Sequence, residues 1–324
     1  MTSIDTNGAN TVTFGAASKT SVTDGDIVAT SGSPMSRTRK IVVIVCTVTM
    51  VLSCIIGAAP FVLMLGNRKA YESVNVSHTT AVNEMDKAHI DTLLKAAEAY
   101  NAELANTQSR VLGEAGDPFT QDGSSVSTND AEYNKQLNRP DDGIMSRISY
   151  PALDIDLPVY HGTGADALRR GAGHMYGTSL PVGGNGTHAV LSAHTGYPDK
   201  LYFDNLHAFG HRAKIGDVFY VTTLGEQLGY KVTKIETINP DDFTHFAIDP
   251  MKDQVTLLTC TPYGVNSQRL LVTGERVDIP GQVPTLDDAP KNNTAWMLYA
   301  VVGVFVVFAG VATTIVIVRM RRMK

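Results

Sequence analysis

The sequence predicts a mainly β domain of about 130 residues, preceded by a helical stalk and flanked by two membrane-spanning helices. One observation is a series of short β-rich segments, separated by turn residues, in the second half of the chain. Another is a pair of long apolar runs without charge, one towards each end. A third is helical periodicity directly after the first run.

The two apolar runs are long enough to span a membrane. Residues 41–65 form a run of 25 residues and residues 296–318 a run of 23, and neither contains a charged side chain. At a rise of about 1.5 Å per residue, either helix crosses a hydrocarbon core of roughly 30 Å. Trp296 and Tyr299 supply interfacial aromatic side chains at one edge of the second run. We therefore predict two transmembrane helices.

A cleaved signal peptide is the alternative for the first run. The small residues at 57–59, GAA, resemble a cleavage site. Apolar segments of signal peptides usually span about 7–15 residues, so this run is long for one. Cleavage would leave the second transmembrane helix in place.

The distribution of charge predicts the orientation of the chain. Basic residues precede the first run and follow the second, so the positive-inside rule places both tails in the cytoplasm and residues 66–295 outside the cell. The tails, 1–40 and 319–324, hold 8 of the 27 basic and 3 of the 32 acidic residues, which leaves 19 basic and 29 acidic residues between them. An acidic outer part argues against nucleic acid as a partner.

The segments around the predicted β domain differ in composition. Residues 1–40 are predicted to be a disordered cytoplasmic tail and 319–324 a short basic one. Residues 66–112 are predicted to be an extracellular helical stalk, with one amphipathic helix over about 80–112. Residues 113–142, rich in Gly, Pro, Asp and Ser, are predicted to be a flexible loop. Residues 281–295 form a polar tether to the second transmembrane helix.

The β domain is predicted over residues 143–280. Short β-rich segments with turn residues between them favour an antiparallel barrel or sandwich. The predicted strands lie at 148–150, 154–160, 189–192, 218–223, 230–236, 255–259 and 270–277.

Cys260 is the only cysteine between the two apolar runs. It therefore has no intramolecular disulfide partner there, and an interchain disulfide, an inert buried thiol and a working thiol remain as alternatives. Cys260 directly follows the predicted strand 255–259 and Arg269 directly precedes the predicted strand 270–277, so pairing of these strands places the two side by side. A guanidinium favours the thiolate form of a nearby thiol and offers hydrogen bonds to an oxyanion. A solvated surface charge is the ordinary alternative for Arg269.

A thiol nucleophile needs a proton partner, most often a histidine. His194 follows an apolar strand and precedes a turn, as Cys260 does, although the spacing separates it only weakly from His174 and His188. His207 and His211 have the spacing of helical metal ligands, but Gly210 lies between them and no glutamate follows His207. We expect neither a metal nor a cofactor.

Several motifs together resemble the sortase family. The segment TLLTC, residues 256–260, matches the T-L-x-T-C signature of sortases, and RLLVTGER resembles the strand that carries their arginine. THAVLSAHTG resembles the segment around their histidine. LPVYHGTG, TSLPVGGNGTHAVLSAH and CTPYGVNSQRLLV resemble the class C, pilus-assembling branch, as does the arrangement with two membrane helices. The resemblance covers roughly residues 85–280.

This resemblance implies a closed eight-stranded β-barrel with added helices and a catalytic role for three residues. Cys260 would be the nucleophile, His194 the acid and base, and Arg269 the group that orients substrate and stabilises the oxyanion. The implied reaction is cleavage of an LPXTG-like sorting motif between Thr and Gly, followed by transfer of the acyl group to a lysine amine of another pilin. Asp117 and Phe119, in the motif DPF, resemble the class C lid.

The implied partners are pilins or surface proteins that carry LPXTG-like sorting signals, in a Gram-positive envelope. Two other functions remain as alternatives. One is a sortase that attaches surface proteins to cell-wall peptide. The other is a membrane-tethered adhesion or scaffold domain without catalysis.

Overall fold

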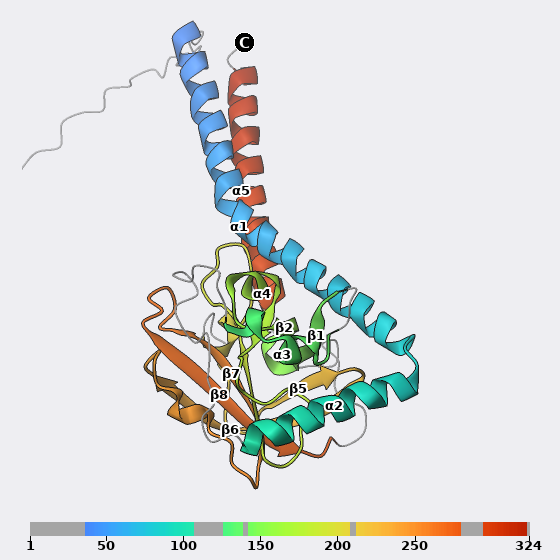
Figure 1. Ribbon diagram of the computed structural model, residues 1–324. Helices are drawn as coiled ribbons and strands as arrows, with labels where there is room; N and C mark the ends of the chain where they lie inside the picture. The colour runs from blue at the N-terminus through green and yellow to red at the C-terminus, as the bar shows by residue number, and fades with distance from the viewer. Residues whose placement is uncertain (1–35, 107–125, 139–141, 208–211, 280–293, 323–324) are drawn as a thin grey trace, which may run out of the picture.

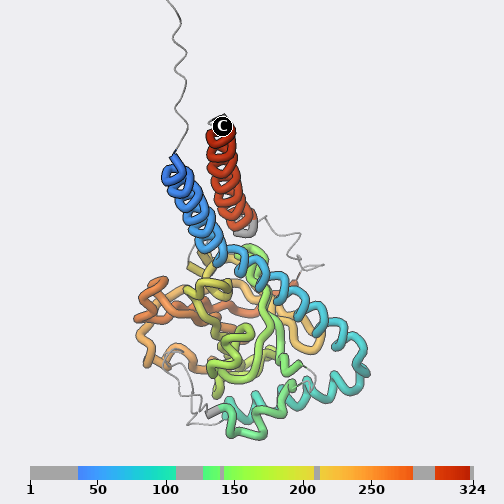
Figure 2. Tube along the Cα trace, turned by 90° about the horizontal axis from the view of Figure 1, so that it is seen from above, coloured from blue at the N-terminus to red at the C-terminus, as the bar shows by residue number. Residues whose placement is uncertain are grey.

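The computed structural model describes residues 36–106, 126–138, 142–207, 212–279 and 294–322. Two long helices, α1 (Arg37–Asn83) and α5 (Thr294–Arg322), lie side by side and extend away from a β-barrel (Figures 1 and 2). They are in close contact: a Cβ atom at Gly57 would lie 3.0 Å from the ring of Phe305.

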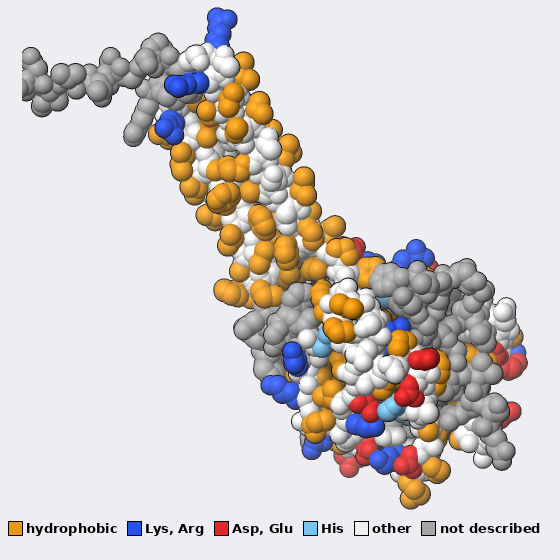
Figure 3. All heavy atoms as spheres, turned by 90° about the vertical axis from the view of Figure 1, so that its left-hand side faces the viewer, with side chains coloured by type: hydrophobic (Ala, Val, Ile, Leu, Met, Phe, Trp, Pro, Cys, Tyr) orange, Lys and Arg blue, Asp and Glu red, His pale blue; other side chains and the backbone are white. Residues whose placement is uncertain are grey.

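Both helices are long and apolar enough to cross a membrane. Their most apolar windows have mean hydropathies of 2.7 and 2.8, and almost none of either window is buried within the protein. Figure 3 shows hydrophobic side chains over the whole shaft and basic side chains at its far tip. An apolar surface of this size is unstable in water, so a lipid environment accounts for it. The prediction of two apolar membrane helices agrees with this finding.

The predicted single helix over 80–112 is wrong, because the structure divides this region between two helices. Helix α1 continues without a break from the apolar run to Asn83, and α2 (Lys87–Asn106) begins after a sharp turn. The turn lets the apolar face of α2 fold back against the barrel. The side chains buried in this contact form one cluster, which includes Val82, Leu94, Ala97, Tyr133, Leu137, Met145, Leu180, Val182 and Leu224. Burial of these side chains determines where the chain turns between the two helices. Helical periodicity alone does not indicate where a helix bends.

The barrel is closed and has eight strands in the order β1-β2-β3-β4-β7-β8-β6-β5. The strand pairs β2/β3 and β4/β7 are parallel and the other pairs are antiparallel. The strands are β1 (Ile144–Tyr150), β2 (Ile155–His161), β3 (Ala172–His174), β4 (Thr187–Ser192), β5 (Val218–Thr223), β6 (Glu226–Ile238), β7 (Asp253–Thr261) and β8 (Gln268–Val277).

The closed eight-stranded barrel confirms the predicted fold class. Each of the seven predicted strands corresponds to an observed strand, whereas β3 was not predicted because it has only three residues. Short helices lie between the strands and above them. They are α3 (Ala131–Lys135), α4 (Ala165–Arg170) and the 3-10 segments η1 (Val126–Asn129), η2 (Pro151–Leu153), η3 (Asp204–Leu206) and η4 (Phe243–Phe246).

The parallel pair β4/β7 brings two loops to the same rim of the barrel, where a functional site can form. In such a pair the carboxyl ends of both strands reach the same rim, and the loops that follow them are neighbours. Strand β8 starts at this rim, because it runs antiparallel to β7. The end of β4, the end of β7 and the start of β8 are therefore adjacent.

Candidate active site

Cys260 and Arg269 are direct partners in the ladder between β7 and β8. Directly paired residues of an antiparallel ladder point to the same face of the sheet, with Cβ atoms about 4.5–5.5 Å apart. Both are buried, with 6% of Cys260 and 3% of Arg269 exposed. The predicted pairing of these strands is thus observed.

The guanidinium of Arg269 is held by the loop that precedes it. Its Nη1 donates hydrogen bonds to the backbone oxygens of Asn266 and Gln268, each at 3.0 Å. Asn266 adopts a φ of 60°, a left-handed conformation that asparagine tolerates better than most residues. Among the described residues Arg269 forms no ion pair. The loop therefore orients a buried cation without neutralising it.

His194 lies at the end of β4, level with Cys260. The parallel register pairs Ser192 with Leu258, an offset of 66 positions, and the same offset relates His194 to Cys260. The backbone contact continues past the last pair, since Ala193 N donates to Leu258 O at 3.1 Å and Thr259 Oγ1 donates to Ala193 O at 2.8 Å. The fold thus brings all three predicted catalytic residues to one rim.

Aromatic side chains surround the ring of His194, which is 3% exposed. The centroids of the His194 and Tyr197 rings are 4.7 Å apart, and Tyr202 lies edge-on at 5.9 Å. Tyr202 in turn packs against Tyr71 of α1, with centroids 5.9 Å apart. This packing links the loop that carries His194 to the helix that leaves the membrane.

His207 also lies near the nucleophile, although the sequence indicated only a metal-ligand spacing for it. Burial lowers the pKa of His207, the charge of Arg212 lowers it further, and a hydrogen bond to the backbone of Cys260 opposes them. Thr195 Oγ1 lies 3.4 Å from His207 Nε2. No signal in the sequence distinguished this position, since it depends on the fold of the loop after β4.

The carboxylate of Asp204 connects the two loops at this rim. Its oxygens accept hydrogen bonds from Gly196 N at 2.9 Å and Tyr202 N at 3.0 Å. Burial raises the pKa of Asp204, while these bonds and one to Tyr263 oppose the rise. Tyr263 belongs to the loop after Cys260, and burial and the charge of Asp204 raise its pKa to about 12. The Asp204 carboxylate thus ties the His194 loop to the Cys260 loop.

The other two candidate histidines have structural partners instead. His174 is fully buried, with Nδ1 2.9 Å from the Tyr133 hydroxyl and Nε2 2.8 Å from Ser179 O. His188 Nδ1 lies 3.0 Å from Ala247 O, and its Nε2 lies 2.8 Å from Thr256 Oγ1. In both rings the two nitrogens are engaged inside the fold, so neither ring is placed to exchange protons with a substrate.

Two sets of sequence predictions concern residues that the structure leaves undescribed. The lid residues Asp117 and Phe119 lie outside the described residues, so the lid stays a prediction. His211 also lies outside the described residues. Within the described ranges, no group of three or more His, Cys, Asp or Glu side chains is arranged to hold a metal. Two cavities of about 450 and 470 Å³ lie away from Cys260, one beside α1 and the other at the end of α2.

A thiol, an imidazole and a guanidinium at one rim can perform nucleophilic acyl transfer. The thiolate is the reactive form of cysteine, an imidazole can move a proton, and a guanidinium can stabilise an oxyanion.

Comparison with known proteins identifies the same region of the chain. A family model described as a sortase domain matches residues 148–277. Sortase A of Streptococcus agalactiae is 30% identical over 150 residues, a match that covers 45% of this chain and 58% of that protein. The chain thus spans less than two thirds of the length of this relative.

Solved structures match a longer part of the chain. Sortase C-1 of Actinomyces oris is 42% identical with a TM-score of 0.53, and the match covers 59% of this chain and 99% of that one. Sortase C of Streptococcus pneumoniae is 37% identical with a TM-score of 0.56, covering 66% of this chain and 100% of that one.

Proposed function

The chain belongs to the sortase family of cysteine transpeptidases, and from this we propose that it is a membrane-anchored enzyme that joins pilin subunits. Cys260 is the proposed nucleophile, His194 the proposed acid and base, and Arg269 the proposed oxyanion-stabilising and substrate-orienting residue. The observation that carries this proposal is the convergence of the three residues at one rim. Cys260 pairs with Arg269 in one ladder, and the parallel ladder places His194 at the same level.

The first half of the proposed reaction is acylation of the enzyme. The Cys260 thiolate attacks the threonine carbonyl of an LPXTG-like motif, which forms a C–S bond and a tetrahedral oxyanion. The guanidinium N–H groups of Arg269 stabilise this charge. Protonated His194 gives its proton to the glycine nitrogen, the C–N bond breaks, and the amine leaves. The product is a thioester on Cys260.

The second half transfers the acyl group to a new amine. A lysine amine of the next pilin attacks the thioester, and neutral His194 accepts the proton that the amine loses. The C–S bond breaks and the thiolate is regenerated as the new amide forms. One amide is exchanged for another, so neither an oxidant nor a nucleotide is needed.

The pilin substrate is proposed from the solved structures that resemble the chain. They include sortase C proteins, among them the pneumococcal one, whose structure bears on pilin substrate specificity. The curated relatives include sortase A proteins, which keeps attachment of surface proteins to cell-wall peptide as a second candidate. The two functions share the acylation half and differ in the amine that completes the reaction.

The membrane orientation is proposed from the charges that flank the two apolar helices. Arg37, Arg39 and Lys40 lie at the start of α1, and further basic residues lie at the end of α5. By the positive-inside rule these ends are cytoplasmic, and the barrel is extracellular. A substrate that emerges from the same membrane then meets the barrel on the outer side.

Mass spectrometry of the full chain in detergent micelles tests the proposal. After incubation with a peptide that carries an LPXTG-type motif, we expect an acyl adduct on Cys260, and a lysine-bearing pilin should release it as an amide. The variant Cys260→Ala should form no adduct, whereas the matched double variant Cys46→Ala/Cys54→Ala should form it normally. Release only by a cell-wall peptide amine would favour the second candidate. Absence of any adduct in the wild type would favour a scaffold without catalysis.

A further inference from the structure

A cavity of about 450 Å³ lies where the membrane helices meet the barrel; Cys260, His194 and Arg269 do not line it, although Leu201 and Tyr202 of the loop after His194 do. Helix α1 forms one wall, from Met64 to Val76, and strands β1 and β2 contribute the opposite wall. Tyr299 of α5 closes one end. The cavity therefore spans the level at which the apolar run, residues 41–65, gives way to charged residues.

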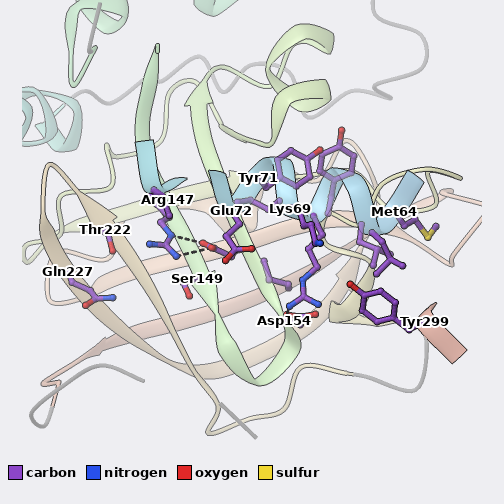
Figure 4. Close-up of a pocket in the computed structure, with 18 residues that line it drawn as sticks. Met64, Lys69, Tyr71, Glu72, Arg147, Ser149, Asp154, Thr222, Gln227 and Tyr299 are labelled. Atoms are coloured by element: carbon purple, nitrogen blue, oxygen red, sulfur yellow. Dashed lines mark hydrogen bonds and ion pairs between the residues drawn. The ribbon is translucent and has the colours of Figure 1, made fainter. Parts of the chain in front are cut away.

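The lining of this cavity changes from apolar to charged along α1. Met64 and Tyr299 line the end nearest the membrane, and Arg147, Thr222 and Gln227 line the end furthest from it (Figure 4). Arg68, Lys69 and Glu72 lie between these ends. From Met64 to Glu72 the α1 wall thus changes in the order in which a lipid passes from acyl chain to head group, and apolar Val76 follows further out.

The walls hold the geometry of the cavity through two ion pairs. Arg68 Nη2 lies 2.5 Å from Asp154 Oδ1, and Arg147 donates to both oxygens of Asp156 at 2.5 and 2.8 Å. The Asp154 and Asp156 carboxylates are mostly buried, with 11% and 9% of their side chains exposed. The Arg68–Asp154 pair joins α1 to the turn before β2, so the cavity is a fixed part of the docked structure.

Lys69 and Glu72 remain available for a ligand. Among the described residues neither side chain forms an ion pair, and both are exposed at the cavity mouth. Three residues along a helix correspond to an axial rise of about 4.5 Å. The cation is on the membrane side and the carboxylate is one turn further out. This order matches a phosphate near the membrane with an ammonium group beyond it.

The balance of charge distinguishes between classes of lipid. The lining has three cationic side chains, Arg68, Lys69 and Arg147, and three anionic ones, Glu72, Asp154 and Asp156. Asp154 and Asp156 are already paired with Arg68 and Arg147, which leaves Lys69 and Glu72 for a ligand. A head group that is only anionic would gain Lys69 but would be repelled by Glu72 at close range. A zwitterionic head group can place each of its charges beside an opposite one.

We propose that this cavity binds a zwitterionic, amine-bearing glycerophospholipid, of the phosphatidylethanolamine class, from the leaflet on the barrel's side. Lys69 binds the phosphate, Glu72 binds the ammonium group, and Met64 and Tyr299 contact the glycerol and the first acyl carbons. A bound lipid at this position seats the barrel at a fixed height above the membrane. The site takes no part in the acyl transfer proposed above, so its test is independent of catalysis.

Native mass spectrometry of the full chain, released from micelles that contain equal amounts of phosphatidylethanolamine and phosphatidylglycerol, tests this site. We expect the wild type to retain one phosphatidylethanolamine in preference to phosphatidylglycerol. Lys69→Gln/Glu72→Gln should lower this retention by about tenfold, the change that about 1.4 kcal/mol produces. The matched control is Lys95→Gln/Asp91→Asn on α2, outside this cavity, which should retain the lipid as the wild type does.

Two further measurements complete the test. One asks whether soluble phosphate compounds compete with the lipid, and the other checks that the variants fold as the wild type does. Soluble glycerophosphoethanolamine, which lacks the acyl chains, should compete poorly even in large excess, and inorganic phosphate should not compete. Thermal unfolding should be the same for both double variants. Equal retention of the two lipids by the wild type, or undiminished retention by Lys69→Gln/Glu72→Gln, would overturn the proposal.

Discussion

Cys260 and Arg269 face each other as register partners, and the guanidinium of Arg269 is fixed by two carbonyl oxygens of its own loop. Both of these hydrogen bonds use Nη1, so the N–H groups on Nε and Nη2 make no hydrogen bond among the described residues. A short loop therefore holds the guanidinium of the residue paired with Cys260. This arrangement suits an oxyanion that forms on a carbonyl attacked by Cys260.

Replacement of Arg269 by lysine should slow acylation while leaving the barrel folded. Lysine keeps the charge but loses the planar fork, so it can neither hold both loop carbonyls nor present a second row of donors. We expect the rate of adduct formation on Cys260 to fall by about 10²-fold, as when one oxyanion donor is removed. The measurement is a single-turnover time course by mass spectrometry. Arg276→Lys, further along β8 and stacked over Tyr230, is the matched control and should acylate normally.

His194 and His207 both lie near Cys260, and substitution should distinguish their roles. Loss of a general acid and base costs roughly 10²- to 10⁴-fold in rate, which we expect for His194→Gln. His207→Gln removes a hydrogen bond to the Cys260 backbone and the contact with Thr195 Oγ1, and it should cost less than about tenfold. The pH dependence of acylation should change in His194→Gln and persist in His207→Gln. A larger loss in His207→Gln would contradict the assignment of the acid and base to His194.

The sequence predicted the strands and the Cys260–Arg269 pair because both depend on local signals. Alternation of side chains and turn residues indicates a strand, and two strands joined by a short loop pair as a hairpin. Cys260 and Arg269 are nine positions apart, so their contact follows from hairpin geometry alone.

The position of His194 could not be predicted in this way, because it depends on contacts between distant parts of the chain. The parallel pairing of β4 with β7 joins residues 66 positions apart, and no local signal specifies it. His174 and His188 differ from His194 only in the partners that the fold supplies. The turn between α1 and α2 was missed for the same reason, since it is set by burial of Val82 and Leu94 against the barrel.

Buried His174 should make the stability of the barrel depend on pH. Burial lowers its pKa to about 4 from 6.5, because the native state excludes the charged ring. Between these values the unfolded chain binds the proton and the native state does not. The stabilisation is therefore complete above about pH 6.5 and is lost as the pH falls towards 4, by up to about 3 kcal/mol. Glutamine can replace both hydrogen bonds without titrating.

Chemical denaturation at several pH values checks this expectation. The unfolding free energy of the wild type minus that of His174→Gln should fall by up to about 3 kcal/mol on acidification from pH 6.5 to 4, since only the wild type loses the contribution of His174. Groups that titrate in both proteins cancel in this difference. A difference that stays constant over the whole pH range would show that His174 does not resist protonation.

The contact between Tyr71 and Tyr202 should couple the membrane helix to the catalytic loop. Tyr71 of α1 packs on Tyr202, which lies edge-on to His194, and Asn67 Nδ2 donates to Asp199 O at 2.8 Å in the same loop. Tyr71→Ala removes a half-buried ring that packs against the barrel core, so we expect a loss of about 1–2 kcal/mol in unfolding free energy. Amide hydrogen exchange should become faster over residues 195–206 by a larger factor than in β7 and β8, whose amides should respond only to the loss of global stability. Val74→Ala, on an exposed part of the same helix, is the matched control and should change neither quantity. If the 195–206 amides exchange equally fast in Tyr71→Ala and the wild type, then α1 tethers the barrel to the membrane without supporting the loop that carries His194.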